Sequence, residues 1–379
     1  MDRGEIERYS RHLILDEVGM AGQEKLKNAK VLCVGAGGLG SPALLYLAAA
    51  GVGEVTIVDD DVVDVSNLQR QIVHASTAVG EYKTASARAT IERVNPLVTV
   101  KEVRERLTLD NGRDLVEACD VVLDGSDNFE TKFLLDDLCV ECGKPNVYAA
   151  ILRFQGQASV FNYPPGQGAT YRDVLEAPPK PGVVPSCAEG GVLGILCGVL
   201  GSIQATEVVK LILQRPVDEI LANRLLLYDA LKMTFDVVPL QTRRRLETTP
   251  RAAAAIGEEE EPSRREDLPP PFALIDATTA AARLADGWRP FVLDVRLDRE
   301  AEICALPFVD LRCPHRHVAT IAASLPRDTD ILVHCKSGFR SKLACRALAD
   351  LGVDATRLFS LDGGILAWAA DVDPRIPRY

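Results

Sequence analysis

A glycine-rich turn between a strand and a helix is the feature that most restricts the fold of this chain. Residues 35–40 read Gly-Ala-Gly-Gly-Leu-Gly, directly after the apolar run at 31–34 and before a helical pattern at 41–50. Glycines at these spacings let the backbone approach a phosphate, and the N-terminus of the helix favours negative charge. The turn therefore predicts a Rossmann-like sheet that binds an adenine nucleotide.

Short apolar runs and helical patterns alternate along the first 245 residues. The expected elements beyond the turn are strands at 55–58, 120–123, 157–163 and 224–240, and helices at 84–94, 129–143 and 191–213. Such alternation is typical of a parallel sheet with helices on both faces. The strands after residue 150 lack long helices between them, so we predict one mixed α/β domain over residues 1–245.

A second, smaller α/β pattern follows a segment that is unsuited to folding. Residues 246–271 contain five prolines and the glutamate run at 258–261, with few large apolar side chains. Such a segment cannot bury enough apolar surface to become ordered, so we predict a disordered linker. The remaining residues, 272–379, are enough for a compact domain. Its expected elements are strands at 292–295 and 331–334 and a helix at 341–351.

The charge and hydropathy of the chain restrict its partners. It has 43 Lys and Arg against 54 Asp and Glu, and this net charge of −11 disfavours general binding to nucleic acid or anionic membranes. Two uncharged stretches, 31–53 and 190–206, are interrupted by glycines, so we expect them in a protein core and not in a membrane. The first residues lack the basic and apolar regions of a secretory signal, and we expect a cytoplasmic protein.

The residues around the glycine turn distinguish two kinds of nucleotide enzyme. Asp59 ends the next strand, 19 residues after Gly40, where a carboxylate can bind the ribose hydroxyls. With the glycines alone, this pattern favours an NAD-dependent dehydrogenase. Arg70, Lys83 and Asp127 favour ATP instead, because a triphosphate carries about four negative charges and needs cations and usually magnesium.

Five short motifs together resemble those of the MoeB/ThiF adenylating enzymes, the bacterial relatives of ubiquitin-activating enzymes. They are Arg8-Tyr9-Ser10-Arg11, the glycine turn, Ser-Asn-Leu-Gln-Arg-Gln at 66–71, Gly-Glu-Tyr-Lys at 80–83 and Asp-Gly-Ser-Asp-Asn at 124–128. The resemblance covers residues 5–240. It implies adenylation of the C-terminal glycine of a small ubiquitin-like sulfur-carrier protein. In that reaction the carrier carboxylate attacks the α-phosphate of ATP and pyrophosphate leaves.

The same resemblance implies roles for individual residues. Those implied to bind ATP and magnesium are Gly37, Gly38, Gly40, Asp59, Asn67, Arg70, Lys83, Asp127 and Asn128. Asp127 would hold the magnesium ion that accompanies ATP, while Arg70 and Lys83 would assist catalysis by neutralising phosphate charge. Since the family is dimeric, Arg11 would reach into the site of a partner subunit, and we expect a homodimer.

One feature of many relatives is missing from this sequence. They hold a structural zinc ion with two Cys-x-x-Cys pairs, but the corresponding segments here, 170–173 and 241–247, contain no cysteine. A single pair, Cys139 and Cys142, lies within a helical pattern, and the isolated His315 and His317 are more typical of a surface. We therefore predict that the chain holds no structural zinc.

Cys187 is a candidate for covalent chemistry. It follows the proline-rich stretch 178–185 and precedes the helix expected at 191–213, whose dipole favours a thiolate. By the resemblance, a cysteine at this place can bond covalently to the activated carrier or its sulfur. A half-buried structural thiol remains the alternative interpretation.

The second domain contains a loop suited to a persulfide. Residues 335–341 read Cys-Lys-Ser-Gly-Phe-Arg-Ser between a strand and a helix, so backbone N–H groups and the helix dipole favour an anion at Cys335. Arg340 adds a fixed positive charge. Tyrosine phosphatases have five residues between Cys and Arg and hold a phosphate, whereas the four here fit a smaller persulfide. With the motifs at 292–296 and 361–368, the loop resembles that of a rhodanese domain, in which Cys335 would carry the sulfur.

Together the two halves resemble the MoeZ-type fusion of an adenylyltransferase with a sulfurtransferase. We therefore predict that a carrier protein is adenylated and then receives sulfur from a rhodanese persulfide, which gives a thiocarboxylate. Thiosulfate or a cysteine-desulfurase persulfide would be the sulfur donor. Two other interpretations stay open: an NAD-linked oxidoreductase with an accessory rhodanese, and a scaffold that holds a carrier without turnover. The sequence does not identify the carrier or its pathway.

Overall fold

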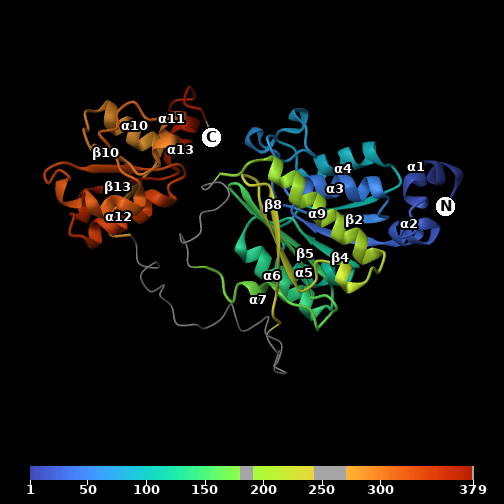
Figure 1. The fold of residues 1–379 in the computed structure, drawn as a ribbon. Coiled ribbons are helices and arrows are strands. Elements are labelled where there is room, and N and C mark those ends of the chain that lie inside the picture. Colours follow the sequence, from blue (N-terminus) through green and yellow to red (C-terminus); the bar gives the residue numbers. More distant parts are fainter. Residues whose placement is uncertain (180–190, 243–269, 378–379) are drawn as a thin grey trace. The chain divides into compact units, whose positions relative to one another are not determined.

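The computed structural model describes residues 1–179, 191–242 and 270–377 (Figure 1). The chain divides into two compact units, Met1–Gly257 and Glu258–Tyr379, each with its own hydrophobic core. The division falls within the predicted linker, 246–271. Most of that linker lies outside the described residues, so its disorder and the domain bounds stay predictions.

Eight strands form a single sheet in the first unit. They are β1 (Lys30–Val34), β2 (Glu54–Val58), β3 (Thr99–Val103), β4 (Val121–Asp124), β5 (Asn146–Leu152), β6 (Gln155–Phe161), β7 (Arg224–Asp229) and β8 (Thr234–Pro239). Their order is β3-β2-β1-β4-β5-β6-β7-β8. Strands β1 to β5 pair in parallel, and β5 to β8 pair antiparallel. This sheet confirms the predicted mixed α/β class.

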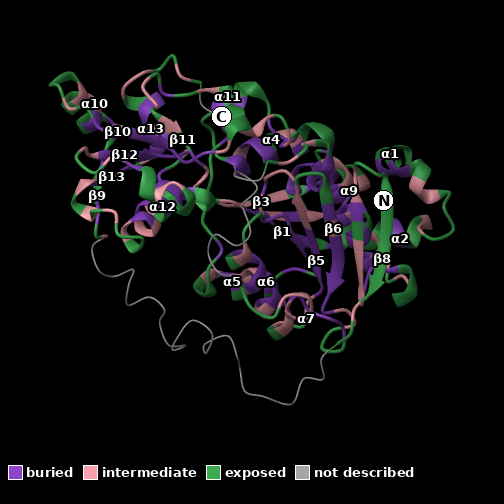
Figure 2. Cartoon of the chain, turned by 60° about the vertical axis from the view of Figure 1, so that its left-hand side comes forward, coloured by how far each residue is buried: buried purple, intermediate pink, exposed green. Residues whose placement is uncertain are grey.

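Helices cover both faces of this sheet. They are α1 (Arg3–Leu13), α2 (Gly19–Asn28), α3 (Gly40–Ala50), α4 (Lys83–Val94), α5 (Leu109–Glu117), α6 (Phe129–Glu141), α7 (Tyr171–Val174) and α9 (Ile195–Ile212). Helices α3, α4 and α9 share a core with one face, around Leu47 and Leu200. Helices α5 and α6 pack on the other face, around Val116 and Leu138. Figure 2 shows β1, β5 and β6 largely buried, whereas β8 is exposed along its length.

Helix α9 corresponds to the apolar helix expected at 191–213. By length and composition alone it could cross a membrane, but 56% of it is buried inside the unit. It contacts α3 and strands β4, β5 and β6, and it places Leu196 and Val208 in the core. In the described part of the chain, α9 is the only helix that meets this length and composition criterion, and it packs as a core helix.

Several elements differ from the prediction. Strands β3 and β5 and helix α5 were not expected, and the segment 224–240 is not one strand but two, β7 and β8. Strand β6 begins and ends two residues earlier than expected, at Gln155 and Phe161. Strand β3 is difficult to detect because it lies at the sheet edge and contains Lys101 and Glu102, so it lacks an apolar run.

Two glycines allow β1 to lead directly into α3. Gly35 has a φ of +96°, in the left-handed region that favours glycine. A Cβ atom on Gly40 would lie 2.0 Å from the carbonyl oxygen of Gly35, so a larger residue would collide with the turn. The glycine turn can therefore bring the N-terminus of α3 close to the end of β1.

The second unit is a smaller, fully parallel α/β layer structure. Its strands are β9 (Ala273–Ile275), β10 (Phe291–Asp294), β11 (Leu311–Arg312), β12 (Ile331–His334) and β13 (Leu358–Leu361), in the order β11-β10-β12-β13-β9. Its helices are α10 (Ala277–Ala285), α11 (Asp298–Ile303), α12 (Phe339–Asp350) and α13 (Gly364–Asp371). The strand predicted at 331–334 coincides with β12, and the helix predicted at 341–351 begins two residues earlier, as α12.

Candidate active sites

A cavity of about 920 Å³ opens at the carboxyl ends of the parallel strands in the first unit. It lies where β1 is flanked by β2 and β4, which is the place where α/β sheets bind their ligands. Residues from the predicted ATP set that line it are Gly37, Gly38, Asp59, Arg70, Lys83, Asp127 and Asn128. The structure therefore brings seven distant residues into one cavity, while their roles stay predictions.

Asp59 supports the glycine turn as well as lining the cavity. Its Oδ2 atom accepts a hydrogen bond from the Ala36 amide at 2.8 Å, and its Oδ1 atom accepts one from the Asp61 amide at 2.9 Å. Burial raises the pKa of Asp59, although the positive charge of Lys83 opposes the rise. The carboxylate is therefore held in place by backbone groups before any ligand arrives.

Lys83 is a buried cation at the start of α4. Its side chain is 7% exposed, and Nζ lies 2.7 Å from Oδ2 of Asp61, whose side chain is 68% exposed. An ion pair with a solvated partner contributes little free energy. An anionic ligand in the cavity can therefore displace Asp61 from Lys83. The displaced carboxylate of Asp61 is exposed to water, so it is not left buried without a partner. Asp61 lies 22 residues before Lys83 in the sequence, so no local pattern pairs the two residues.

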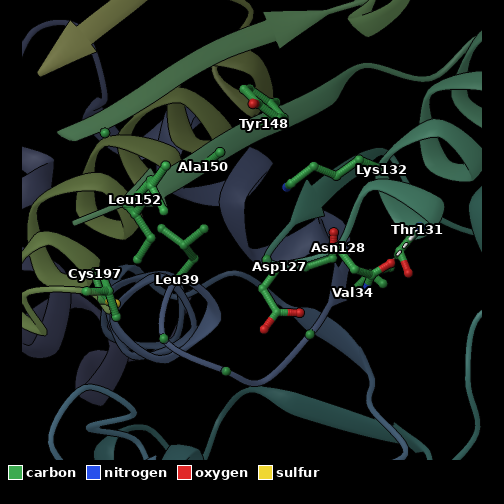
Figure 3. A pocket seen from close by; sticks show the side chains of 18 of the residues that line it. Val34, Leu39, Asp127, Asn128, Thr131, Lys132, Tyr148, Ala150, Leu152 and Cys197 are labelled. Atoms are coloured by element: carbon green, nitrogen blue, oxygen red, sulfur yellow. Dashed lines mark hydrogen bonds between the residues drawn. The ribbon is translucent and has the colours of Figure 1, made fainter. Parts of the chain in front are cut away.

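Polar and apolar residues line different sides of the cavity. Figure 3 shows Asp127, Asn128 and Lys132 on one side and Leu39, Leu152 and Cys197 on the other. Asn128 accepts a hydrogen bond from the Thr131 amide at 2.9 Å, so its side-chain oxygen caps helix α6. Asp127 precedes this cap and is exposed to the cavity.

Lys132 belongs to a buried ion pair that sequence reasoning missed. Its Nζ atom lies 3.0 Å from Oδ2 of Asp124 and 2.9 Å from the carbonyl oxygen of Ala149. The ammonium group also lies 4.8 Å from the ring centroid of Tyr148. These partners satisfy the cation, so Lys132 connects the ends of β4 and β5 and is not a free charge for a ligand. In the sequence, Lys132 stands one helical turn before Asp136, and both are buried in α6.

Three residues of the predicted ATP set do not line the cavity of their own chain. Gly40 packs against the glycine turn, as described above. The side-chain oxygen of Asn67 accepts a hydrogen bond from the Asp64 amide at 3.1 Å, in the short 3-10 helix Val65–Asn67. Arg11 is exposed on α1. The expected role of Arg11 concerns a partner subunit and stays a prediction.

The cavity continues from its charged end over the antiparallel strands. Residues that line this part include Ile151, Leu152, Gln157, Leu227, Tyr228 and Thr234. Beside it, β8 exposes Phe235, Val237 and Val238, which are 50%, 49% and 44% exposed. The site therefore joins a charged end at the glycine turn to a second end, lined by both apolar and polar residues, near the exposed edge of the sheet.

The second candidate site is the Cys335 loop between β12 and α12. Sγ of Cys335 accepts a hydrogen bond from the Gly338 amide at 3.2 Å and lies 3.7 Å from Oγ of Ser341. The carbonyl oxygen of Cys335 accepts a hydrogen bond from the amide of Ile365 in α13 at 2.9 Å. The cysteine residue is fully buried. The Gly338 amide therefore points at the sulfur, as a donor in an anion site would, and the sulfur is enclosed.

Arg340 is occupied by a buried carboxylate. Its two terminal nitrogens donate to the two oxygens of Glu300, each at 2.7 Å, and both side chains are at most 10% exposed. Burial by itself would raise the pKa of Glu300, but hydrogen bonds from Arg340 and the Leu297 amide lower it overall. The charge of Arg340 is therefore matched within the fold. Glu300 lies 40 residues away in the sequence, and no local pattern identifies it.

A second buried charged group lies at the end of β10, beside the end of β12. Arg296 donates to both oxygens of Asp294, at 2.9 and 2.7 Å. Nε2 of His334, the residue before Cys335, lies 3.8 Å from Oδ2 of Asp294. Burial lowers the pKa of His334 to about 4, against the opposing effect of the Asp294 charge. The imidazole is therefore neutral at physiological pH.

The remaining cysteine and histidine predictions are not tested. Within residues 1–179, 191–242 and 270–377, no three His, Cys, Asp or Glu side chains gather as a metal site requires. Cys139 is buried in α6, where burial raises the pKa of its thiol, and His315 and His317 lie in a 3-10 helix. Cys187 lies outside the described residues, as does most of the segment 241–247. The absence of zinc and the role of Cys187 stay predictions.

Comparisons with known proteins identify the family. The ThiF family model matches residues 9–249, and the Rhodanese-like domain model matches residues 276–371. The probable adenylyltransferase/sulfurtransferase MoeZ of Mycobacterium tuberculosis is 43% identical over 388 aligned residues, covering 100% of this chain and 96% of that protein. Adenylyltransferase and sulfurtransferase MOCS3 of Sus scrofa is 38% identical, covering 100% of this chain and 89% of that protein.

Two further similarities concern the first unit. The SAMP-activating enzyme E1 of Haloferax volcanii is 50% identical over 242 residues, covering 64% of this chain and 88% of that protein. The crystal structure of E. coli MccB with ATP has a TM-score of 0.54 and 22% identity, covering 62% of this chain and 72% of that one. At that identity the likeness supports the fold alone. The full-length relatives confirm an enzyme with two activities. The chain belongs to the ThiF family and joins a ThiF-type adenylyltransferase domain to a C-terminal rhodanese-like sulfurtransferase domain.

Proposed function

We propose that the chain adenylates the C-terminal glycine of a small ubiquitin-like sulfur-carrier protein and then converts it to a thiocarboxylate. The observation that carries this proposal is the shape of the first cavity. Its charged end combines the glycine turn with Arg70 and Lys83, and its other end runs over β6 to β8 beside exposed apolar side chains. An extended chain terminus can lie along this second part and bring its carboxylate to the nucleotide.

The residues at the charged end would act on ATP by position and charge. Amide groups of the glycine turn and the N-terminus of α3 would bind phosphate oxygens. Lys83, released from the solvated Asp61, and Arg70 would balance the charge that develops as the carboxylate attacks the α-phosphate. Pyrophosphate would then leave, and the carrier would be held as an acyl adenylate.

Asp127 is suited to hold a magnesium ion. Its carboxylate is exposed to the cavity, and carboxylate oxygens are ligands that magnesium prefers. The bound ion would supply further neutralisation of the phosphate charges. Asp124 is not an equal candidate, because it is fully buried and paired with Lys132.

The second unit would deliver the sulfur. Cys335 would accept a sulfane sulfur from thiosulfate or a cysteine-desulfurase persulfide, and the terminal persulfide sulfur would attack the acyl-adenylate carbonyl as AMP leaves. The resulting acyl disulfide would be cleaved by a thiolate, either Cys187 or an external thiol. The electron pair of the S–S bond would leave with the carrier as a thiocarboxylate, and Cys335 would remain in a disulfide that a further thiol reduces.

The assembly and location of the enzyme belong to the same proposal. Exposed apolar side chains on and between the first three helices, Ile14, Met20 and Tyr46, support a homodimer. Arg11 would then contribute to the site of the partner subunit. We propose a cytoplasmic enzyme without nucleic-acid or membrane partners, in accord with its net charge of −11.

Pyrophosphate exchange into ATP tests the first step. Small ubiquitin-like proteins that end in Gly-Gly and are encoded in the same genome are purified and added one at a time to the full chain. We expect exchange that depends on one of them, and Lys83→Ala or Asp127→Ala should lower its rate about 10²- to 10³-fold. Lys101→Ala, which removes an exposed charge on β3, is the matched control. Wild-type rates in both site variants would show that the assigned site is wrong.

A further inference from the structure

Two buried serines lie beside the sulfur of Cys335 and have no role in the chemistry proposed above. Ser341 is the third residue of α12, Ser360 lies in β13, and both are fully buried. Oγ of Ser341 lies 3.7 Å from Sγ of Cys335 and 3.0 Å from Oγ of Ser360. Buried hydroxyl groups need hydrogen-bond partners, and these two find them in each other and near the sulfur.

The pairing of β12 with β13 places Ser360 next to α12. Val333 lies opposite Ser360 in this pairing. Side chains alternate between the two faces of a sheet, so Ser360 faces the same side as Val333 and Cys335. On that side lies the core cluster that includes Ala344 and Leu348 of α12. Ser360 is therefore a hydroxyl group that meets α12 beside an apolar cluster.

The hydrogen bonds of Ser341 can be assigned atom by atom. Its hydroxyl donates to the carbonyl oxygen of Gly338 at 2.9 Å and accepts from Ser360. A hydroxyl has one donor and two acceptor positions, so its second lone pair can accept from the S–H group of Cys335. In the thiol form, the proton of Cys335 therefore points at Ser341.

Loss of the thiol proton reverses this contact. A thiolate can only accept, so Ser341 would turn its own hydrogen from Gly338 to the sulfur. The carbonyl oxygen of Gly338 keeps a donor, because it also accepts from the Lys342 amide at 3.3 Å. Ser360 still donates to Ser341 and holds its oxygen in place. The turn therefore gives the sulfur anion a second donor beside the Gly338 amide, and each of these buried groups keeps a partner.

We propose that Ser341 stabilises the thiolate of Cys335 as a hydrogen-bond donor, and that Ser360 is a positioning residue that fixes the Ser341 hydroxyl. In sulfur transfer from thiosulfate, the Cys335 thiolate attacks the sulfane sulfur, and sulfite leaves with the electron pair of the S–S bond. Cyanide then takes that sulfur as thiocyanate, and Cys335 is released as a thiolate. A donor at Sγ increases the fraction of thiolate before the first step and stabilises the leaving group in the second. The inference rests on Cys335 as the sulfur carrier of the proposed function.

The surroundings of Cys335 allow its protonation to be followed by a pH profile. The charged or titratable groups of its loop, strand and helix include His334, Lys336, Arg340 and Cys345. Burial lowers the pKa of His334 to about 4 and raises the pKa of Cys345. Arg340 is paired with Glu300, whose pKa is lowered. Lysine and arginine are ordinarily charged between about pH 5.5 and pH 9, so a titration in this range reports on Cys335.

Steady-state kinetics of the full chain test the role of Ser341. The ratio kcat/KM for thiosulfate, with cyanide as the acceptor, reports the attack by the Cys335 thiolate and is measured over this pH range. In Ser341→Ala the pH of half-maximal kcat/KM should rise by about one to two units, with a 10- to 100-fold loss on the acid side. The ratio should approach the wild-type value at the alkaline end. Ser360→Ala should shift the midpoint in the same direction by less.

The controls separate this inference from the proposed function. Ser324→Ala, which changes an exposed serine of the same unit, should keep the wild-type profile. If Cys335→Ala keeps its sulfurtransferase activity, the proposed sulfur delivery itself fails. If Cys335 is essential and Ser341→Ala has the wild-type midpoint, only the role of Ser341 is overturned.

Two further outcomes decide between a chemical and a structural role. A loss in Ser341→Ala that is equal at every pH would overturn the proposal, because it assigns Ser341 to the folding of the loop. Tryptophan fluorescence in urea shows whether that variant folds. If it does not fold, Ser360→Ala decides, and a wild-type midpoint in Ser360→Ala would then overturn the proposal.

Discussion

The two units use the same backbone arrangement at their sites but enclose very different spaces. In each, a central parallel strand leads through a short loop into a helix, at the glycine turn after β1 and at the Cys335 loop after β12. The first loop opens into a cavity of about 920 Å³, whereas Cys335 is fully buried. Backbone N–H groups and a helix N-terminus thus provide for an anion in both, and the side chains around the loop set the size of the anion that fits.

The positive charges at the two loops are also paired differently. Lys83 is buried, but its partner Asp61 is 68% exposed and can be solvated when a ligand takes its place. Arg340 and its partner Glu300 are both buried and doubly hydrogen-bonded. We therefore expect Lys83 to serve a ligand and Arg340 to hold the loop that carries the sulfur.

The largest expected effect is that of Cys335→Ala. The variant removes the only group in its loop that can carry a sulfane sulfur, so thiosulfate sulfurtransferase activity and carrier thiocarboxylation should both be abolished. Adenylation depends on the other loop, and pyrophosphate exchange should continue at the wild-type rate. Sulfur transfer from thiosulfate to cyanide and mass spectrometry of the carrier measure the two losses. A variant that loses pyrophosphate exchange as well would contradict the independence of the two loops.

Cys187→Ala, measured in the same assays, tests whether sulfur transfer includes a covalent step at Cys187. Cys187 should be needed neither for pyrophosphate exchange nor for sulfur transfer from thiosulfate, and we expect a partial loss of thiocarboxylation because an external thiol can replace it. A large loss would support a covalent step at Cys187. An unchanged rate would assign it to the structural alternative.

The next effect is on stability and concerns Glu300→Gln. Removing one partner of a buried ion pair costs about 3–5 kcal/mol, because the other charge stays buried without compensation. We expect the second unit to lose stability by an amount of this order. Both tryptophans of the chain, Trp288 and Trp368, lie in this unit, so the fluorescence of the full chain in urea reports its unfolding alone.

The control for Glu300→Gln lies on the same helix. Asp298 is 82% exposed in α11, and Asp298→Asn should leave the urea midpoint almost unchanged. A small effect of Glu300→Gln, equal to that of Asp298→Asn, would show that Arg340 is not held as the geometry indicates.

Local sequence patterns predicted the strand–loop–helix segments at both candidate sites but did not predict helix α5. The strand, glycine turn and helix around Gly35 follow one another in the chain, and so do β12 and the Cys335 loop, so the sequence alone predicted where both loops lie between a strand and a helix. Helix α5 was missed because only Gly112 and Val116 are buried in it, which leaves almost no apolar face to detect.

The charge partners were beyond local reasoning for a different reason. Asp61 and Lys83 are 22 residues apart, and Glu300 and Arg340 are 40 apart. Only the fold brings these pairs together, and only the fold shows which partner is solvated.

The smallest predicted effect is a pH dependence that belongs to the second unit. His334 is buried beside Asp294, and burial lowers its pKa to about 4, whereas an unfolded histidine titrates near 6.5. The unfolded chain therefore binds the proton first, and acid favours unfolding. The contribution of His334 to stability should be complete above about pH 6.5 and be lost as the pH falls toward 4, amounting to roughly 3 kcal/mol over that range.

Urea titrations of the full chain between pH 7 and pH 4.5, followed by tryptophan fluorescence, measure this loss. His334→Leu should flatten the pH dependence in this window, while His317→Ala, which changes an exposed histidine of the same unit, should retain it. Asp294 has a lowered pKa, because hydrogen bonds from Arg296 outweigh the effect of its burial, so it loses its own contribution only at still lower pH and does not obscure the result. A slope that persists in His334→Leu would assign the acid sensitivity to another group. In that case the residues around Cys335 would be more accessible to water than their burial indicates. The second site would then resemble the open cavity of the first unit more closely.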